Sequence, residues 1–213
     1  MACAICMVRR PRRFCPGVRG DICTICCGTE REVTVACPLD CEYLQEARRH
    51  DKPVPLVPEQ LPNRDIRVSE KLLAENEVLL AFLGSTVARA ALDTSGATDL
   101  DVREALEGLI RTYRSLESGV YYESVPSNLL AAGIYQAVQR DTQEFRRQEK
   151  EHTGVTKTRD ADVLGCLVFL QRLEFEYNNG RPRGRAFLSA LLEFYGGPPS
   201  ASPPPAPSSL ILP

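Results

Sequence analysis

The chain has 213 residues, of which 43% are hydrophobic and 25% are charged, and its formal net charge is -2. This composition excludes a chain that is disordered throughout, a collagen-like chain, and a strongly basic protein that bulk charge would draw onto nucleic acid. The sequence contains no apolar run of about 18 residues, and its start lacks the apolar stretch of a secretory signal. We therefore predict a cytoplasmic protein that does not bind membranes.

Cysteines are concentrated at the start of the chain. Eight of the nine lie in the first 41 residues: Cys3, Cys6, Cys15, Cys23, Cys26, Cys27, Cys37 and Cys41. They include two C-x2-C pairs and one C-x3-C pair, and such spacers let two thiolates bind one tetrahedral ion at about 2.3 Å. We predict that residues 1–50 form a zinc-finger module with two structural Zn²⁺ ions, each held by four cysteines. An iron–sulfur cluster uses the same ligands and stays an alternative.

Two groupings of the eight cysteines keep the close pairs together. In the first, Cys3, Cys6, Cys23 and Cys26 share one ion, and the other four cysteines share the second. In the second, Cys3 and Cys6 join Cys15 and Cys27, which leaves Cys23, Cys26, Cys37 and Cys41 for the other ion. We favour the first grouping, because adjacent Cys26 and Cys27 point in different directions and suit two separate sites. Either grouping fills all the metal positions with protein ligands and leaves none for a catalytic water.

Local patterns around the cysteines predict a short strand over residues 31–36, which are β-branched and alternating, and a helix over residues 42–50. A strand, a turn with ligands and a helix with ligands at its start resemble treble-clef zinc modules. The whole head, CPGVRGDICTICCGTEREV…CPLDCEYL, resembles the heads of uncharacterised bacterial proteins. That resemblance covers about 45 residues and implies no activity.

The sequence pattern of the rest of the chain predicts a helical bundle. Residues 51–65 contain four prolines and form an extended linker. Apolar residues then recur at helical spacing over the 66–195 region, which predicts a four- to five-helix bundle and a mainly α protein. The expected helices span residues 69–92, 99–118, 127–153, 161–177 and 184–195. The tail, 196–213, is rich in proline and serine and is predicted to be disordered. Cys166 lies in the most apolar helix and is expected to be an inert core residue.

Two arginine clusters stand outside this pattern. The first, between the Cys3–Cys6 pair and Cys15, comprises Arg9, Arg10, Arg12 and Arg13, and the second comprises Arg181, Arg183 and Arg185. Arginines near a four-thiolate zinc site offset its charge of -2, and arginines in such density also contact nucleic-acid phosphates. We favour charge compensation or protein contact, and keep nucleic-acid binding as the alternative.

These features predict a non-enzymatic zinc-binding protein that acts as a protein-interaction module or adaptor with a protein partner. The alternative is a zinc-dependent RNA- or DNA-binding protein that uses both arginine clusters. A third hypothesis is an enzyme with a pocket in the bundle near Tyr121, Tyr122 and Glu123, which lie in a turn between two predicted helices. No catalytic residue is assigned, because the chain contains no phosphate-binding loop, hydrolase motif or dinucleotide-binding motif.

Overall fold

We analysed a computed structural model of the chain, which describes residues 2–51 and 57–196. The described part is mainly helical, with eight α-helices and one two-stranded hairpin, so the predicted mainly α class is confirmed. The predicted disordered tail, from residue 197 onward, and residues 52–56 of the predicted linker lie outside the described residues. Within the described ranges no helix is long and apolar enough to cross a membrane.

The first 51 residues, which we call the head, contain a hairpin and two helices. Strand β1 (Arg13–Cys15) pairs antiparallel with β2 (Gly20–Ile22), and α1 (Thr24–Thr29) and α2 (Glu42–His50) follow. The predicted helix after the last cysteine of this region is therefore correct. The hairpin and α1 were not predicted.

The strand predicted over residues 31–36 is wrong, because this segment forms a tight loop. The carbonyl of Glu30 accepts hydrogen bonds from the N–H groups of three residues, Val33, Thr34 and Val35, and the segment forms only an isolated bridge between Arg31 and Val35. Within the loop Glu32 has a positive φ of 54°, in the left-handed region that favours glycine. This conformation directs the Glu32 side chain toward the segment between residues 178 and 185.

The remaining described residues, which we call the body, form a helical bundle. Its helices are α3 (Glu70–Glu75), α4 (Glu77–Asp93), α5 (Asp99–Glu117), α6 (Leu129–Thr153), α7 (Asp160–Tyr177) and α8 (Ala186–Tyr195), preceded by a 3-10 turn, η1 (Pro58–Gln60). Four of the five predicted helices match single helices within a few residues. The first predicted helix is two helices, because the chain leaves helical geometry at Asn76, whose side-chain amide donates to the carbonyl of Leu72 at 3.0 Å.

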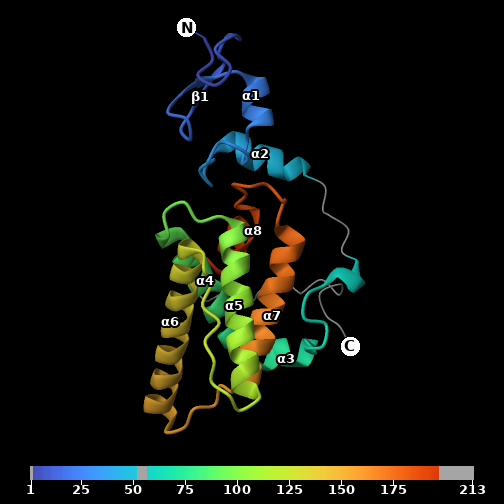
Figure 1. Cartoon of the computed structure of the whole chain (residues 1–213), viewed down its shortest axis with the longest axis vertical. Helices are drawn as coiled ribbons and strands as arrows, with labels where there is room; N and C mark the ends of the chain where they lie inside the picture. The colour runs from blue at the N-terminus through green and yellow to red at the C-terminus, as the bar shows by residue number, and fades with distance from the viewer. Residues whose placement is uncertain (1, 52–56, 197–213) are drawn as a thin grey trace.

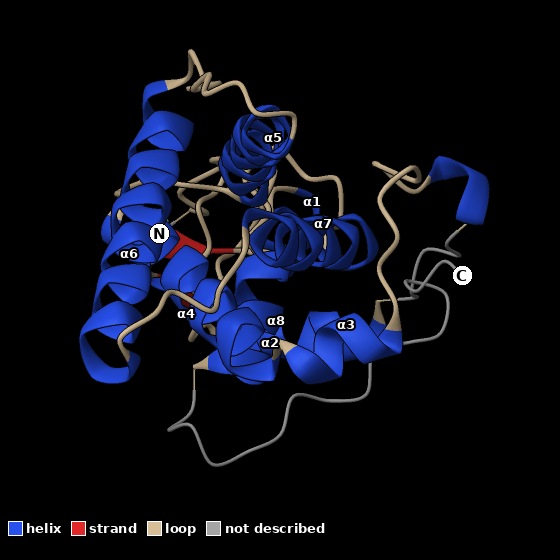
Figure 2. Cartoon of the chain, turned by 90° about the horizontal axis from the view of Figure 1, so that it is seen from below, coloured by secondary structure: helices blue, strands red, loops and turns tan. Residues whose placement is uncertain are grey.

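The helix starts follow the predicted capping chemistry. The Ser69 side chain accepts from the N–H of Leu72, and Thr98 and Asp101 form a capping box at the start of α5. The apolar core lies between the helices, with α7 packed against α4, α5 and α8 (Figure 2). Cys166 in α7 has no exposed surface, and burial raises its pKa to about 12. This placement matches its predicted role as a core residue.

The head lies at one end of the bundle, with α2 nearest to the body and the hairpin beyond it (Figure 1). This is the end where α7 stops and α8 starts. Two head segments contact it: Leu39 packs against the apolar core of the body, and Glu32 hydrogen-bonds to the α7–α8 connection. The head therefore contacts the body through the loops that follow Cys27 and Cys37, and its hairpin lies farther from the body.

Candidate metal centre

Four cysteines of the head converge on one point. The sulfur atoms of Cys3, Cys6, Cys23 and Cys26 all lie within 4.8 Å of one another, and we call these residues the distal quartet. Four sulfurs about 2.3 Å from a zinc ion form a tetrahedron with edges of about 3.8 Å. The four sulfurs are close to that arrangement, so the distal quartet can hold a metal ion. The structure thus brings together the two C-x2-C pairs, as in the first of the two groupings.

Backbone N–H groups point at these sulfurs. Cys23 N–H donates to the sulfur of Cys3 at 3.2 Å, Cys26 N–H to that of Cys23 at 3.4 Å, and Arg9 N–H to that of Cys6 at 3.5 Å. Hydrogen bonds of this kind stabilise the thiolate, which is the form that binds metal. The residue after the second ligand, Met7, has a positive φ of 54°, which closes the tight turn that places Arg9 there.

The pKa values of the distal quartet are spread apart. Burial opposes ionisation of Cys3, but backbone N–H groups of Cys6, Cys23 and Ile5 outweigh burial and lower its pKa to about 6. Burial, together with the neighbouring sulfurs, raises the pKa of Cys26 to about 12. Four thiols this close cannot all ionise without a cation among them. A divalent ion removes this conflict, because its charge stabilises all four thiolates.

The other four cysteines line one small cavity. Cys15, Cys27, Cys37 and Cys41, which we call the proximal quartet, surround a cavity of about 20 Å³ between the hairpin and α2. Burial raises the pKa of Cys37, and the nearby charges of Cys15 and Cys41 act in the same direction. These sulfurs are less tightly gathered: among the described residues, only the distal quartet has its ligand atoms within 4.8 Å of one another.

A close backbone approach brings the segments that carry Cys15 and Cys37 together. A Cβ atom on Gly17, two residues after Cys15, would lie 2.7 Å from the carbonyl oxygen of Ala36, the neighbour of Cys37. Only glycine allows this distance without a shift of the backbone. Gly17 therefore lets the hairpin turn approach the segment that carries Cys37.

The first arginine cluster is divided between the two quartets. The Arg9 side chain lies beside Cys23 and Cys6, and these thiols raise the pKa of Arg9. Arg13 lies 3.8 Å from the sulfur of Cys27 and stacks on the Tyr43 ring, 3.7 Å from its centroid. The other two members, Arg10 and Arg12, are exposed. Each quartet therefore has one arginine in place to offset thiolate charge.

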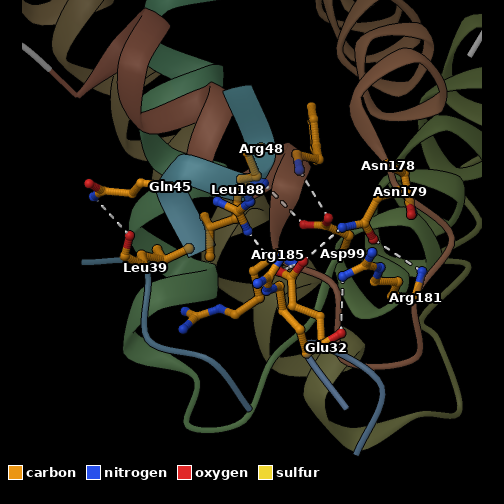
Figure 3. Close-up of polar contacts among 12 residues, drawn as sticks. Glu32, Leu39, Gln45, Arg48, Asp99, Asn178, Asn179, Arg181, Arg185 and Leu188 are labelled. Atoms are coloured by element: carbon orange, nitrogen blue, oxygen red, sulfur yellow. Dashed lines mark hydrogen bonds and ion pairs between the residues drawn. The ribbon is translucent and has the colours of Figure 1, made fainter. Parts of the chain in front are cut away.

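The second arginine cluster lies against the head (Figure 3). The Arg181 guanidinium donates to the carbonyl of Arg31 at 3.1 Å. The backbone N–H groups of Arg183 and Arg185 donate to the carbonyl and carboxylate of Glu32 at 2.9 and 3.1 Å. Burial lowers the pKa of Arg185. Among these arginines only Arg183 has an exposed side chain, so most of the cluster is engaged within the molecule.

The residues of the predicted bundle pocket lie on the surface. Tyr121, Tyr122 and Glu123 are exposed in the α5–α6 connection, where the Tyr121 hydroxyl donates to the Glu123 carboxylate. A separate open hollow of about 580 Å³ lies between α3, α5 and α7. Its wall includes the ion pair of Arg114 and Asp65, with a nitrogen–oxygen distance of 2.7 Å, and this pair lowers the pKa of Asp65.

Sequence reasoning missed two residues of this region, Glu32 and Leu39. Glu32 is buried, with a relative exposure of 1%, and Leu39 lies within the C-x3-C spacer, whose spacing predicts metal ligands and no contact with the body. An acidic residue in a polar loop carries no signal of burial, since its partners are about 150 positions away. The chain matches no protein-family model, no curated protein and no solved structure.

Proposed function

We propose that the protein is a non-enzymatic adaptor whose head holds two structural zinc ions, one in each quartet. The observation that carries this proposal is the convergence of the four distal sulfurs within 4.8 Å. The common cavity of the four proximal cysteines supports the second ion. Four thiolates in a tetrahedron favour zinc or an iron–sulfur centre, and the single arginine beside each quartet suits the charge of -2 on a zinc site with four thiolates.

The adaptor surface is proposed to lie on the loop and strand of the head beyond α2 (Figure 1). Three large apolar side chains are exposed there: Met7, Val8 and Phe14 have relative exposures of 72%, 84% and 61%. The exposed guanidinium groups of Arg10 and Arg12 lie in the same stretch of chain. Exposed apolar residues with arginine between them fit a protein partner that presents apolar and acidic side chains.

The engagement of arginines within the molecule favours this proposal over nucleic-acid binding. Arg9 and Arg13 lie beside thiols, the Arg181 guanidinium donates to the carbonyl of Arg31, and the Arg185 side chain is partly buried. This leaves the exposed side chains of Arg10, Arg12 and Arg183 for phosphates. Nucleic-acid affinity rests on several such contacts, each of which changes the slope of log affinity against log salt by about 0.7–0.9.

Site-specific photo-crosslinking in the organism that makes the protein tests the proposal. A crosslinker at Val8 or Phe14 should capture one defined protein partner, and a crosslinker at Leu129, which is 86% exposed on the body, should not capture it. Replacement of Arg10 and Arg12 with alanine should weaken that capture without loss of metal, since neither residue is placed at a thiol. Binding of single-stranded RNA or duplex DNA at micromolar concentration near 0.15 M salt, lost in the same variant, would instead establish the nucleic-acid alternative.

A further inference from the structure

We propose that metal binding by the proximal quartet fixes the head on the helical body, so that loss of this ion releases the head. This inference rests on the proposed function for its second metal ion. The two quartets differ in position: the distal quartet lies in the part of the head beyond α2, and the loops between the proximal cysteines contact the body (Figure 1). Occupancy of the two sites should therefore have different consequences.

The first of these loops joins Cys27 to Cys37 and carries Glu32. The Glu32 carboxylate is buried and accepts hydrogen bonds from Arg48 in α2 at 2.7 Å, from the side-chain amide of Asn179 at 2.8 Å, and from the N–H of Arg185 at 3.1 Å (Figure 3). Its carbonyl accepts from the N–H of Arg183 at 2.9 Å. One head residue thus contacts three residues of the α7–α8 connection.

The second loop is the spacer between Cys37 and Cys41, and it carries Leu39. The Leu39 side chain packs on the apolar core of the body, and its carbonyl accepts from the Gln45 side chain in α2 at 3.2 Å (Figure 3). Polar and apolar contacts with the body therefore come from loops that begin and end at proximal cysteines. An ion held by these cysteines fixes the ends of both loops.

The geometry of Glu32 depends on this restraint. Its φ of 54° is unfavourable for a residue with a side chain, and its carboxylate gives up water for the buried position. Without the ion the loop is free to relax, and the buried contacts of Glu32 no longer offset the strain. Release of the head would uncover Arg181 and Arg185 at the end of the body.

Amide hydrogen exchange of the full chain, followed by NMR, tests the inference. The N–H groups of Arg183 and Arg185 belong to the body but are covered by Glu32 of the head, and so they report docking directly. Replacement Cys37→Ser should accelerate their exchange about tenfold or more, with little change for amides in the middle of α7. Replacement Glu32→Ala should accelerate the same two amides while both metal ions stay bound.

The distal quartet provides the matched control. Replacement Cys6→Ser should remove the distal ion and leave exchange at Arg183 and Arg185 slow. Equal acceleration by Cys6→Ser and Cys37→Ser would overturn the inference, because docking would then follow the folding of the whole head. Slow exchange in Cys37→Ser, with two ions in the wild type and one in the variant, would overturn this inference but leave the proposed function standing. A wild-type chain that binds only one ion would overturn the second site of the proposed function and this inference with it.

Discussion

The head and the body are held together by different means. The buried apolar cluster of the head includes only two residues other than cysteine, Ile22 and Val35, whereas the body buries apolar side chains from all of its helices except α3. Burial of apolar surface contributes roughly 25 cal/mol per Å², so the body has the means to fold alone and the head does not. Under the proposed function, metal ions bound by the thiols would supply the stability that the head lacks.

Metal removal is the change expected to separate the two regions most strongly. Structural zinc contributes roughly 10–16 kcal/mol to the folding of small zinc modules, more than the rest of the head supplies. A strong chelator should therefore unfold α1, α2 and the hairpin and leave α4 to α8 folded. Far-ultraviolet circular dichroism should retain most of the helical signal. Loss of most of that signal on chelation would contradict the comparison, because the two regions would then unfold as one unit.

Leu167→Ala tests whether the apolar core stabilises the body. Leu167 is fully buried in α7, so truncation should lower the free energy of unfolding of the body by about 2–5 kcal/mol. Leu129→Ala, at an exposed position of α6, is the control and should change it by less than about 0.5 kcal/mol. Chemical denaturation measures both values. The metal content should be the same in both variants, and a loss of metal in Leu167→Ala would mean that the head depends on the core of the body.

Gly17→Ala tests the close approach within the head. A Cβ at this position meets the carbonyl oxygen of Ala36 at 2.7 Å, so we expect a destabilisation of about 1–3 kcal/mol and weaker metal binding by the proximal quartet. Gly28→Ala is the matched control, because nothing lies within 4 Å of its Cβ position. Competition with a colorimetric chelator measures both variants. Equal metal affinity in Gly17→Ala and the wild type would show that the hairpin turn does not position Cys15.

The smallest expected effect is a pH dependence of the body at Asp99. Burial raises the pKa of Asp99 to about 6, although its carboxylate accepts hydrogen bonds from the N–H groups of Phe187 and Leu188. A raised pKa means that the folded body binds this proton more tightly than the unfolded chain does. The stability linked to this proton is present below about pH 4 and is lost as the pH rises to about 6.

Replacement Asp99→Asn should remove that part of the pH dependence, which corresponds to at most one bound proton. Urea denaturation of wild type and variant between pH 4 and 7 measures the difference. Parallel curves for the two proteins over this range would contradict the raised pKa of Asp99.

The helices of the body were predictable because their signals are local. The apolar stripes, the capping Ser69 and the capping box of Thr98 and Asp101 all lie within a few residues of the helix ends that they define. The break at Asn76 was not predictable in this way, since the apolar stripe continues through it from Leu72 to Leu80. The hairpin escaped prediction because its strands have three residues each, too short for alternation to be recognised.

The cysteines of the candidate site could be predicted from the sequence, but the contacts of the surrounding loops with the body could not. Cysteine spacing left two groupings open, and the adjacency of Cys26 and Cys27 favoured the one whose thiols the structure brings together as the distal quartet. The alternation at residues 31–36 misled, because the carbonyl of Glu30 closes a tight loop there and Glu32 takes a left-handed conformation. Contacts between Glu32 and the α7–α8 connection depend on the tertiary fold, and no local pattern in the sequence encodes them.

Native mass spectrometry of the full chain, purified without added metal, tests the central claim that the head is built on two ions. We expect two zinc ions in the wild type, and one in each of Cys3→Ser and Cys41→Ser, which remove a ligand from the distal and the proximal quartet. Cys166→Ser should retain two ions, because this cysteine lies in the core of the body. A wild-type chain with one zinc ion that is lost in Cys3→Ser and kept in Cys41→Ser would contradict the claim, as would the mass of an iron–sulfur cluster.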